Sequence, residues 1–437
     1  MRKILEILLT GILVSMYYFP FEFTFFPAAN TKMMMAGVGI VAILLYFITK
    51  REFTLPGEVL GLLLLAGSVS LISYFSITYN QTPDKTYVSY IISATVWLSS
   101  SFVVCHVIRQ VHGRVDVPLI VNYLTGVCLF QCFIALAIEF SPVVQTTVDR
   151  WIVGGAYLRN LERIYGIGCA LDVAGTRFSC VLVCLSYLLA FKAEEMTKGK
   201  VAFLFFAFAV ITAIGNMIAR TTSVGSIMGI AIMFALGLVR AGGTPESGFG
   251  KFLSTAIIIL LIVIPVCVLF YRTNPKIHDL TRFAFEGFFS LAEKGKWEVS
   301  SNETLKHMVI WPEELRTWII GDGYFLNQRY DPNYIGDATV AGFYMGTDVG
   351  YCRFLFYFGA VGLTALSAVM AFAAWIGGNN FSNYALMFLL VLLAGFIMWM
   401  KSSTDIFVFF SLFVSAGLVR EEYGLSDTSS PVTDSHS

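Results

Sequence analysis

Apolar stretches long enough to cross a lipid bilayer recur along almost the whole chain, and they constrain its fold more than any other feature. A helix needs about 20 apolar residues to span the hydrocarbon core. Twelve candidate spans fit this requirement: 4–18, 32–48, 58–77, 87–108, 117–140, 168–191, 200–218, 222–239, 252–270, 348–375, 382–400 and 405–419. The first and last are short; the first is kept as a span, and leaving out the last gives eleven as the alternative count. The pattern predicts an all-α polytopic membrane protein with about 12 transmembrane helices.

The composition of the 437-residue chain excludes several other classes of protein. Hydrophobic residues make up 57% and charged residues 13%, with a mean hydropathy of +0.74. Soluble domains average about 45–50% apolar and about 25% charged residues. The formal net charge is zero, so no general basic field points to nucleic acid. A soluble enzyme, a disordered protein and a nucleic-acid-binding protein are therefore excluded.

The eight cysteines lie inside or at the ends of apolar runs, without the spacing of metal ligands. We interpret them as small buried hydrophobic residues. Neither a disulfide framework, a metal site nor a bound cofactor is expected.

Lysine and arginine residues in the short loops predict the orientation in the membrane. With the N-terminus inside, twelve of these residues face the inner side and seven face the outer side. Cytoplasmic loops carry this positive excess, so both termini are predicted to be cytoplasmic. The two sizeable segments 141–167 and 271–346 then lie outside.

Loops and spans divide the chain into five predicted parts. Residues 1–140 hold the first five spans, 141–270 hold spans six to nine with an arginine-bearing outer loop, and 271–346 form a large outer loop. Residues 347–419 hold spans ten to twelve, and 420–437 form a disordered cytoplasmic tail. Within the large loop we expect an amphipathic helix in 301–318, where Leu305, Met308, Val309 and Trp311 alternate with polar residues.

Arginines stand before or inside the spans that run inward from the outer face. Arg163 precedes span six, Arg177 lies within it, and Arg220 precedes span eight in Arg220-Thr221-Thr222-Ser223. Helix N-termini offer free N–H groups to anions, and guanidinium groups suit phosphate oxygens. We therefore predict an anion site for a lipid diphosphate. The alternative is that these arginines pair locally, as Arg177 could with Asp172, or extend to lipid headgroups.

Two further residues are candidates for proton transfer. His307 lies in the large loop, and Asp348 stands at the start of span ten. Each could act as a general base. The alternatives are a structural role for His307 and a first-turn helix carboxylate for Asp348. Asp322, between two glycines, is interpreted as a turn residue.

Three segments resemble the superfamily of O-antigen polymerases and O-antigen ligases, which are membrane glycosyltransferases of the C type. Arg163-Ile164-Tyr165-Gly166 is similar to the family's Arg-x-x-Gly entry to a helix, and Arg220-Thr221-Thr222-Ser223-Val224-Gly225 to its polar turn. Ile320-Gly321-Asp322-Gly323-Tyr324, followed by Gly346-Thr347-Asp348-Val349-Gly350-Tyr351 and Arg353-Phe354-Leu355-Phe356-Tyr357-Phe358-Gly359, resembles the surface-polysaccharide polymerases. The resemblance covers about 150–400.

The resemblance implies a metal-independent glycosyl transfer at the periplasmic face of a bacterial inner membrane. Donor and acceptor are both oligosaccharides linked to a polyprenyl (undecaprenyl) diphosphate. Arg163 and Arg220 are expected to hold the diphosphate, and Asp348, or alternatively His307, to accept the acceptor's proton. The expected auxiliary cations are Arg177, Arg282, Lys306 and Arg353.

Two other activities remain as alternatives to a polymerase. Ligases of this family place a histidine near the start of the helix after the long loop, where this chain has Asp348. That difference favours a polymerase over a ligase that joins polymer to lipid A core. A flippase of lipid-linked oligosaccharide would have deep charges and an internal repeat, and the sequence shows neither. Membrane lipids and a chain-length regulator are the other expected partners; nucleic acid is not.

Overall fold

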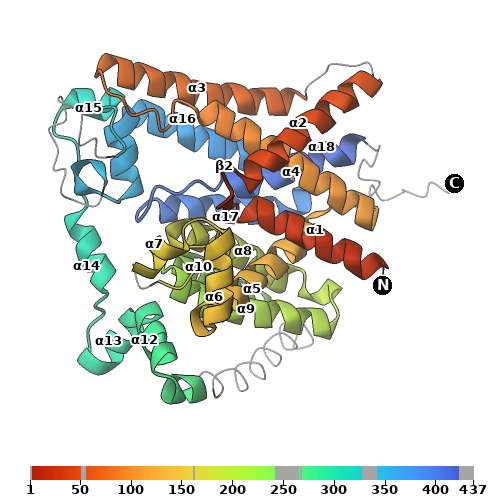
Figure 1. Cartoon of the computed structure of the whole chain (residues 1–437), viewed down its shortest axis with the longest axis vertical. Helices are drawn as coiled ribbons and strands as arrows, with labels where there is room; N and C mark the ends of the chain where they lie inside the picture. Colours follow the sequence, from red (N-terminus) through yellow and green to blue (C-terminus); the bar gives the residue numbers. More distant parts are fainter. Residues whose placement is uncertain are drawn as a thin grey trace.

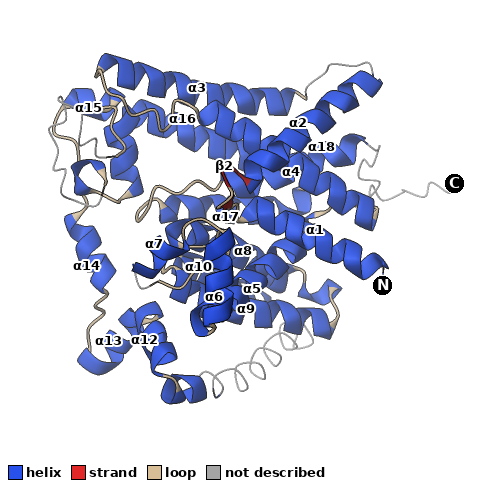
Figure 2. Cartoon of the chain, in the orientation of Figure 1, coloured by secondary structure: helices blue, strands red, loops and turns tan. Residues whose placement is uncertain are grey.

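Helices make up nearly all of the computed structural model, which describes residues 2–50, 56–160, 163–241, 265, 268–326 and 342–422 (Figures 1 and 2). Six of the described helices combine the length and hydropathy of a membrane span. They are α3 (Gly57–Tyr79), α4 (Tyr90–His112), α5 (Val117–Phe140), α8 (Leu171–Phe191), α9 (Lys198–Ile218) and α16 (Gly350–Asn380).

Five further helices coincide with shorter predicted spans. They are α1 (Arg2–Tyr18), α2 (Thr31–Lys50), α10 (Thr222–Ala241), α17 (Ala385–Met398) and α18 (Phe407–Glu422). The predicted span 252–270 lies almost entirely outside the described residues. An all-α membrane protein is confirmed, while the count of twelve spans stays a prediction.

The long helices run roughly side by side, with the short helices gathered at one end of the bundle (Figure 1). These are α12 (Pro275–Ala284), α13 (Glu286–Lys294), α14 (Ser300–His307) and α15 (Leu315–Ile320) from the predicted outer loop. Helix α1 begins and helix α18 ends at the opposite end of the bundle. Three short 3₁₀ helices, Ala193–Glu195, Tyr344–Gly346 and Ser382–Tyr384, lie in connecting segments. The assignment of the two ends to periplasm and cytoplasm stays a prediction.

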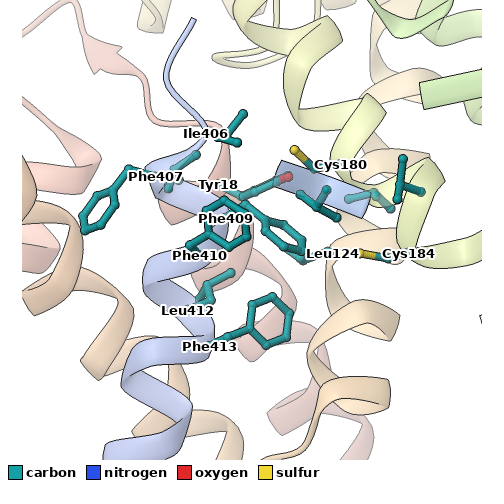
Figure 3. Close-up of a cluster of buried hydrophobic side chains, with 14 of the residues drawn as sticks. Tyr18, Leu124, Cys180, Cys184, Ile406, Phe407, Phe409, Phe410, Leu412 and Phe413 are labelled. Atoms are coloured by element: carbon teal, nitrogen blue, oxygen red, sulfur yellow. The ribbon is translucent and has the colours of Figure 1, made fainter. Parts of the chain in front are cut away.

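Helix α8 forms the centre of the bundle, where α10, α9, α17 and α5 pack against it. Its Cys180 and Cys184 join Tyr18, Leu124 and the phenylalanines of α18 in a buried apolar cluster (Figure 3). The seven described cysteines are all buried, as predicted, and are free of disulfide bonds; Cys267 lies outside the described residues. Close packing of these buried side chains fixes the positions of the helices, and thereby the positions of the polar residues at their ends.

A small β-hairpin is a described element that the apolar pattern does not predict. Strands β1 (Glu22–Phe23) and β2 (Phe26–Asn30) are antiparallel. The hairpin also contacts the segment after α6 (Pro142–Trp151), since Thr24 N donates to Trp151 O over 3.0 Å and Val153 N to Glu22 O over 3.0 Å. Helix α7 (Gly155–Asn160) follows. Strands this short carry no readable alternation, so sequence patterns miss them.

Helix α16 is broken near its start, within the predicted span 348–375. Phe358 and Gly359 leave the helical conformation, with φ and ψ of 66° and −171° at Gly359. A Cβ at Gly359 would lie 2.2 Å from Ile319 O, so only glycine lets α15 approach this closely. The uninterrupted part, 360–380, has the length of about 31 Å that a bilayer core requires. The continuous helix therefore begins about a dozen residues later than predicted.

The chain after α15 satisfies the carbonyl groups that this break exposes. Asp322 N donates to Phe356 O over 2.6 Å and Gly323 N to Tyr357 O over 3.1 Å. From α3, the Ser76 hydroxyl donates to the same Tyr357 O over 2.7 Å. The outer loop is thus attached to the helix bundle by backbone hydrogen bonds.

The helix predicted within 301–318 is instead two helices, α14 and α15, because Pro312 lies between them and lacks the N–H that a continuous helix needs. Leu305 and Met308 pack, as expected of apolar positions, against a small second core around Tyr344 and Phe356. Val309 and Trp311 are exposed, contrary to the predicted apolar face.

Candidate functional site

Arg163 is positioned by a tight turn that is fastened to α5. The buried Gln131 of α5 accepts from Ile167 N over 2.9 Å and donates to Ile167 O over 2.9 Å. A Cβ at Gly166 would lie 2.3 Å from Gln131 Oε1. The glycine of the Arg-x-x-Gly segment is therefore required for this contact, which holds Arg163 just before α8.

Arg163 and Arg220, the two predicted diphosphate ligands, converge on one aromatic ring of the outer loop. The guanidinium carbon lies 4.2 Å from the Phe283 ring centroid for Arg163 and 3.9 Å for Arg220. Burial lowers the pKa of both guanidinium groups, although their neighbouring carboxylates raise it. The structure thus places two partly dehydrated cations together, 57 residues apart in sequence, as an anion site requires.

Loop residues also hold Arg220 directly. Its guanidinium forms an ion pair with Glu286 at 2.9 Å and donates to Phe283 O at 3.0 Å and to the Ser301 hydroxyl at 3.0 Å. A cavity of about 870 Å³ opens beside these residues, with Arg220, Arg282 and Glu293 in its wall. An anion that binds Arg220 here would have to compete with Glu286.

The start of α10 does not provide the free N–H groups and hydroxyls predicted for it. Thr222 N, Ser223 N and Val224 N donate to the carbonyls of the three residues from Ala219 to Thr221. The Thr222 hydroxyl donates to Gly215 O over 3.0 Å, and the Thr221 hydroxyl donates to the Asp172 carboxylate. A tight turn consumes these groups before any ligand arrives, so the Arg220 side chain and the Ser223 hydroxyl are what remains of the predicted site at this helix end.

Asp172 and Lys401 form an ion pair that sequence reasoning did not find. Lys401 Nζ lies 3.0 Å from Asp172 Oδ1 and 3.1 Å from the Thr221 hydroxyl. The pair connects the start of α8 with the segment between α17 and α18. The local pairing considered for Arg177 with Asp172 is thus not the one observed. The sequence places both charges near the ends of predicted spans. It does not predict their pairing, because 229 residues separate them.

Asp348 lies beside Arg353 at the start of α16. Its Oδ1 is 3.5 Å from Arg353 Nη1, and 29% of its side chain is exposed. Burial and the neighbouring Asp172 carboxylate raise the pKa of Asp348 to about 6, although the cations Arg353 and Lys401 oppose this rise. A carboxylate with this pKa accepts a proton at neutral pH far more readily than an ordinary one.

Arg353 is almost fully buried and held from several sides. Its guanidinium carbon lies 3.7 Å from the Phe325 ring centroid, Nη1 donates to the Ser403 hydroxyl at 3.0 Å, and Nη2 donates to Phe325 O at 3.3 Å. These contacts make Arg353 a fixed neighbour of Asp348 rather than a mobile phosphate ligand.

Arg177 lies deeper in the bundle than the other candidates. Its guanidinium carbon is 5.5 Å from the Phe19 ring centroid, and its Nε has no hydrogen-bond partner among the described residues. No described contact joins it to Arg163 or Arg220. The structure therefore does not place Arg177 with the arginine pair.

The three remaining candidates lie on the surface of the outer loop. Arg282 forms a two-point ion pair with Glu293 at 2.7 and 2.8 Å. Lys306 pairs with Glu303 at 2.7 Å. His307 is exposed at the end of α14 and forms no side-chain hydrogen bond to a described residue. Nothing in this part of the structure sets His307 up as a base.

The arrangement combines three features at one end of the bundle: the Arg163–Arg220 pair, the Asp172–Lys401 pair, and Asp348 with a raised pKa. Asp172 links them electrostatically, because its charge raises the pKa of both Asp348 and Arg163. The site can neutralise an anion and accept a proton. No family model matches this chain, and the comparisons with curated proteins and with solved structures also find no match.

Proposed function

We propose that this protein is a glycosyltransferase of the bacterial inner membrane. It would polymerise oligosaccharide repeat units carried on a polyprenyl diphosphate, at the periplasmic face and without a metal ion. The product would be a polysaccharide of the O-antigen or capsule type.

The observation that carries the proposal is the occurrence of Asp348 and the Arg163–Arg220 pair at the same end of the helix bundle. A general base with a pKa near the working pH suits the removal of a hydroxyl proton. Two guanidinium groups suit the stabilisation of a departing diphosphate. An exporter of the same lipid would need the arginines and could use a carboxylate for proton coupling, but it needs no base that deprotonates a sugar hydroxyl.

In the proposed reaction, a hydroxyl oxygen of one lipid-linked repeat attacks the anomeric carbon of a second lipid-linked chain. The new carbon–oxygen bond forms as the bond from that carbon to the diphosphate oxygen breaks. Asp348 takes the hydroxyl proton, and the bonding electrons leave with the diphosphate. Arg163 and Arg220 stabilise the charge that develops on the leaving group.

Deletion of the gene, followed by gel analysis of surface polysaccharide and lipid-linked intermediates, tests this function. We expect the polysaccharide ladder to collapse to a single capped repeat. Loss of all surface chains with long lipid-linked polymer would instead identify a ligase. Single repeats trapped at the cytoplasmic face would identify a flippase and contradict the proposal.

Complementation of the deletion strain tests the site. Arg163→Ala and Arg220→Ala are expected to abolish polymer formation while membrane insertion, measured by immunoblot of membranes, stays normal. Lys192→Ala, which removes an exposed ion pair with Glu195 on the predicted inner side, is the matched control and should restore the ladder. Full activity of both arginine variants would refute the assignment.

A further inference from the structure

A second cavity lies beneath α15, separate in its lining from the arginine pair. Its volume is about 310 Å³, within the range of small-molecule sites. Residues from three parts of the chain line it: Asn80 follows α3, Trp311 and Arg316 belong to the outer loop, and Asp322 and Tyr344 flank the junction with α16.

Aromatic rings form one wall of this cavity. Trp311 is 51% exposed although its ring stacks on Trp318, with centroids 5.9 Å apart and planes at 8°. Tyr324 and Tyr344 form a second stacked pair at 5.2 Å, and Phe356 packs against Tyr344 at 5.6 Å. Exposed indole rings arranged in this way suit the apolar C–H face of a flat ligand.

Polar groups also line the cavity. Asp322 Oδ1 accepts from the Thr317 hydroxyl at 2.7 Å and from Arg316 Nη2 at 3.1 Å, and Oδ2 accepts from the Tyr344 hydroxyl at 3.3 Å. A second lone pair on Oδ2 remains for a ligand donor. Arg316 also donates to Asn80 Oδ1. Burial raises the pKa of Asp322, although these hydrogen-bond donors oppose the rise.

The charge of the cavity wall disfavours an anion. Glu313, Glu314 and Asp322 carry three carboxylates against the single guanidinium of Arg316. Both glutamates are exposed and near the rim. A diphosphate would be repelled here, whereas an uncharged ligand rich in hydroxyl groups would find acceptors in excess.

The cavity is also preorganised. The chain that carries Asp322 is hydrogen-bonded to Phe356 O within the break of α16, and Asn80 Nδ2 donates to Gly321 O at 3.0 Å. Binding therefore costs little ordering of this wall.

We propose that this cavity is a saccharide subsite, in which one uncharged sugar ring stacks on Trp311 and donates hydroxyl hydrogen bonds to Asp322 and to the glutamates at the rim. That this sugar belongs to a repeat unit of the lipid-linked oligosaccharide rests on the proposed function. The subsite would hold the glycan while the arginine pair holds the diphosphate.

The test is ligand binding by the full-length protein in detergent, measured by saturation-transfer NMR. The probe is the repeat-unit oligosaccharide released by mild acid from its lipid diphosphate carrier in the source organism, which then carries no diphosphate. We expect wild-type protein to bind it, and Trp311→Ala and Glu313→Gln to weaken binding, the former by at least tenfold. Both side chains are exposed, so these variants are expected to fold.

Two controls separate this subsite from the rest of the loop. Trp297→Ala removes another loop tryptophan that is 50% exposed, and Arg220→Ala removes the arginine pair; neither should change oligosaccharide binding. Inorganic diphosphate should not compete with the oligosaccharide.

Three results would be decisive against one proposal or the other. Binding that persists unchanged in Trp311→Ala would overturn the location of the subsite. No binding by wild-type protein that still forms polymer in cells would overturn the subsite and leave the proposed function standing. Binding that depends on Trp311, in a protein whose deletion leaves the polysaccharide ladder intact, would refute the function and leave the subsite standing.

Discussion

The substitution Asp348→Asn should have opposite effects on activity and stability. The amide has nearly the shape of the carboxyl group but cannot accept the proton of an attacking hydroxyl. Removal of a general base typically lowers the rate by about 10²–10⁴-fold. In the wild-type protein, activity should be half-maximal near pH 6, the pKa of Asp348, and should fall about tenfold per pH unit below it.

The effect on stability follows from the same pKa. It rises from an ordinary value of 3.8 to about 6 in the folded protein, and each unit corresponds to about 1.4 kcal/mol. The full shift would give about 3 kcal/mol, and partial hydration of the 29% exposed side chain reduces our expectation to about 2 kcal/mol.

The sign of the stability change depends on pH. Below about pH 4, Asp348 is protonated in both folded and unfolded chains, so it contributes no penalty. Between about pH 4 and 6 the unfolded chain loses the proton first, and the folded state is progressively destabilised. Above pH 6 the whole penalty is present. Asp348→Asn removes it, so the variant should be more stable at pH 8 and equal to wild type at pH 4.

Thermal unfolding of both proteins in detergent, followed from pH 4 to pH 8, provides the measurement. The melting temperature of the variant should exceed that of wild type by a few degrees at pH 8, and the gap should close on acidification. Parallel curves at every pH, or a variant that is less stable at pH 8, would refute the assignment of a buried, destabilised carboxylate. Full polymer formation by the variant would refute its role as the base.

Three further substitutions test other parts of the structure. Arg220→Lys keeps the charge but loses the planar fork, so polymer formation should fall at least tenfold in complementation assays. Gly359→Ala places a side chain in a region of φ and ψ restricted to glycine, which costs about 1–3 kcal/mol before any clash. It should expose the outer loop to trypsin in membrane vesicles, whereas Gly126→Ala, with open space around its Cβ position, should not. Lys401→Met removes a cation that lowers the pKa of Asp348, so the acid limb of the pH–activity profile should move above pH 6.

The positions of the helices could be predicted from the sequence because hydrophobic length is a local property. Helices α5 and α9 begin and end within two residues of their predicted spans. The break at Phe358 and Gly359 could not be predicted in this way, since it lies inside a continuous apolar run. The break depends on the packing of α15, which lies 40 residues earlier in the chain, against Gly359 of α16. Such a long-range contact leaves no periodic signal in the sequence.

The candidate site was predictable only in part. Arg163 and Arg220 could be paired because each precedes a helix that starts at the same predicted membrane face. The loop residue Phe283, which brings their side chains together, was not predicted. The Asp172–Lys401 pair and the engaged hydroxyl of Thr221 depend on three helix ends meeting in space, and the sequence alone does not specify this meeting.

The broken helix α16 also determines the order in which the protein can be assembled. The carbonyl groups that fix the outer loop belong to Phe356 and Tyr357, which are synthesised after the loop itself, whereas Ser76 is synthesised long before it. When the loop is synthesised, Asn80 is already available to Gly321 O, but the carbonyl groups of Phe356 and Tyr357 are not. The loop therefore acquires these backbone anchors only after the start of α16 has been made. The loop is fully attached only when these three distant segments have joined, so a ribosome that stalls before residue 356 should leave a chain whose loop is more accessible to proteases.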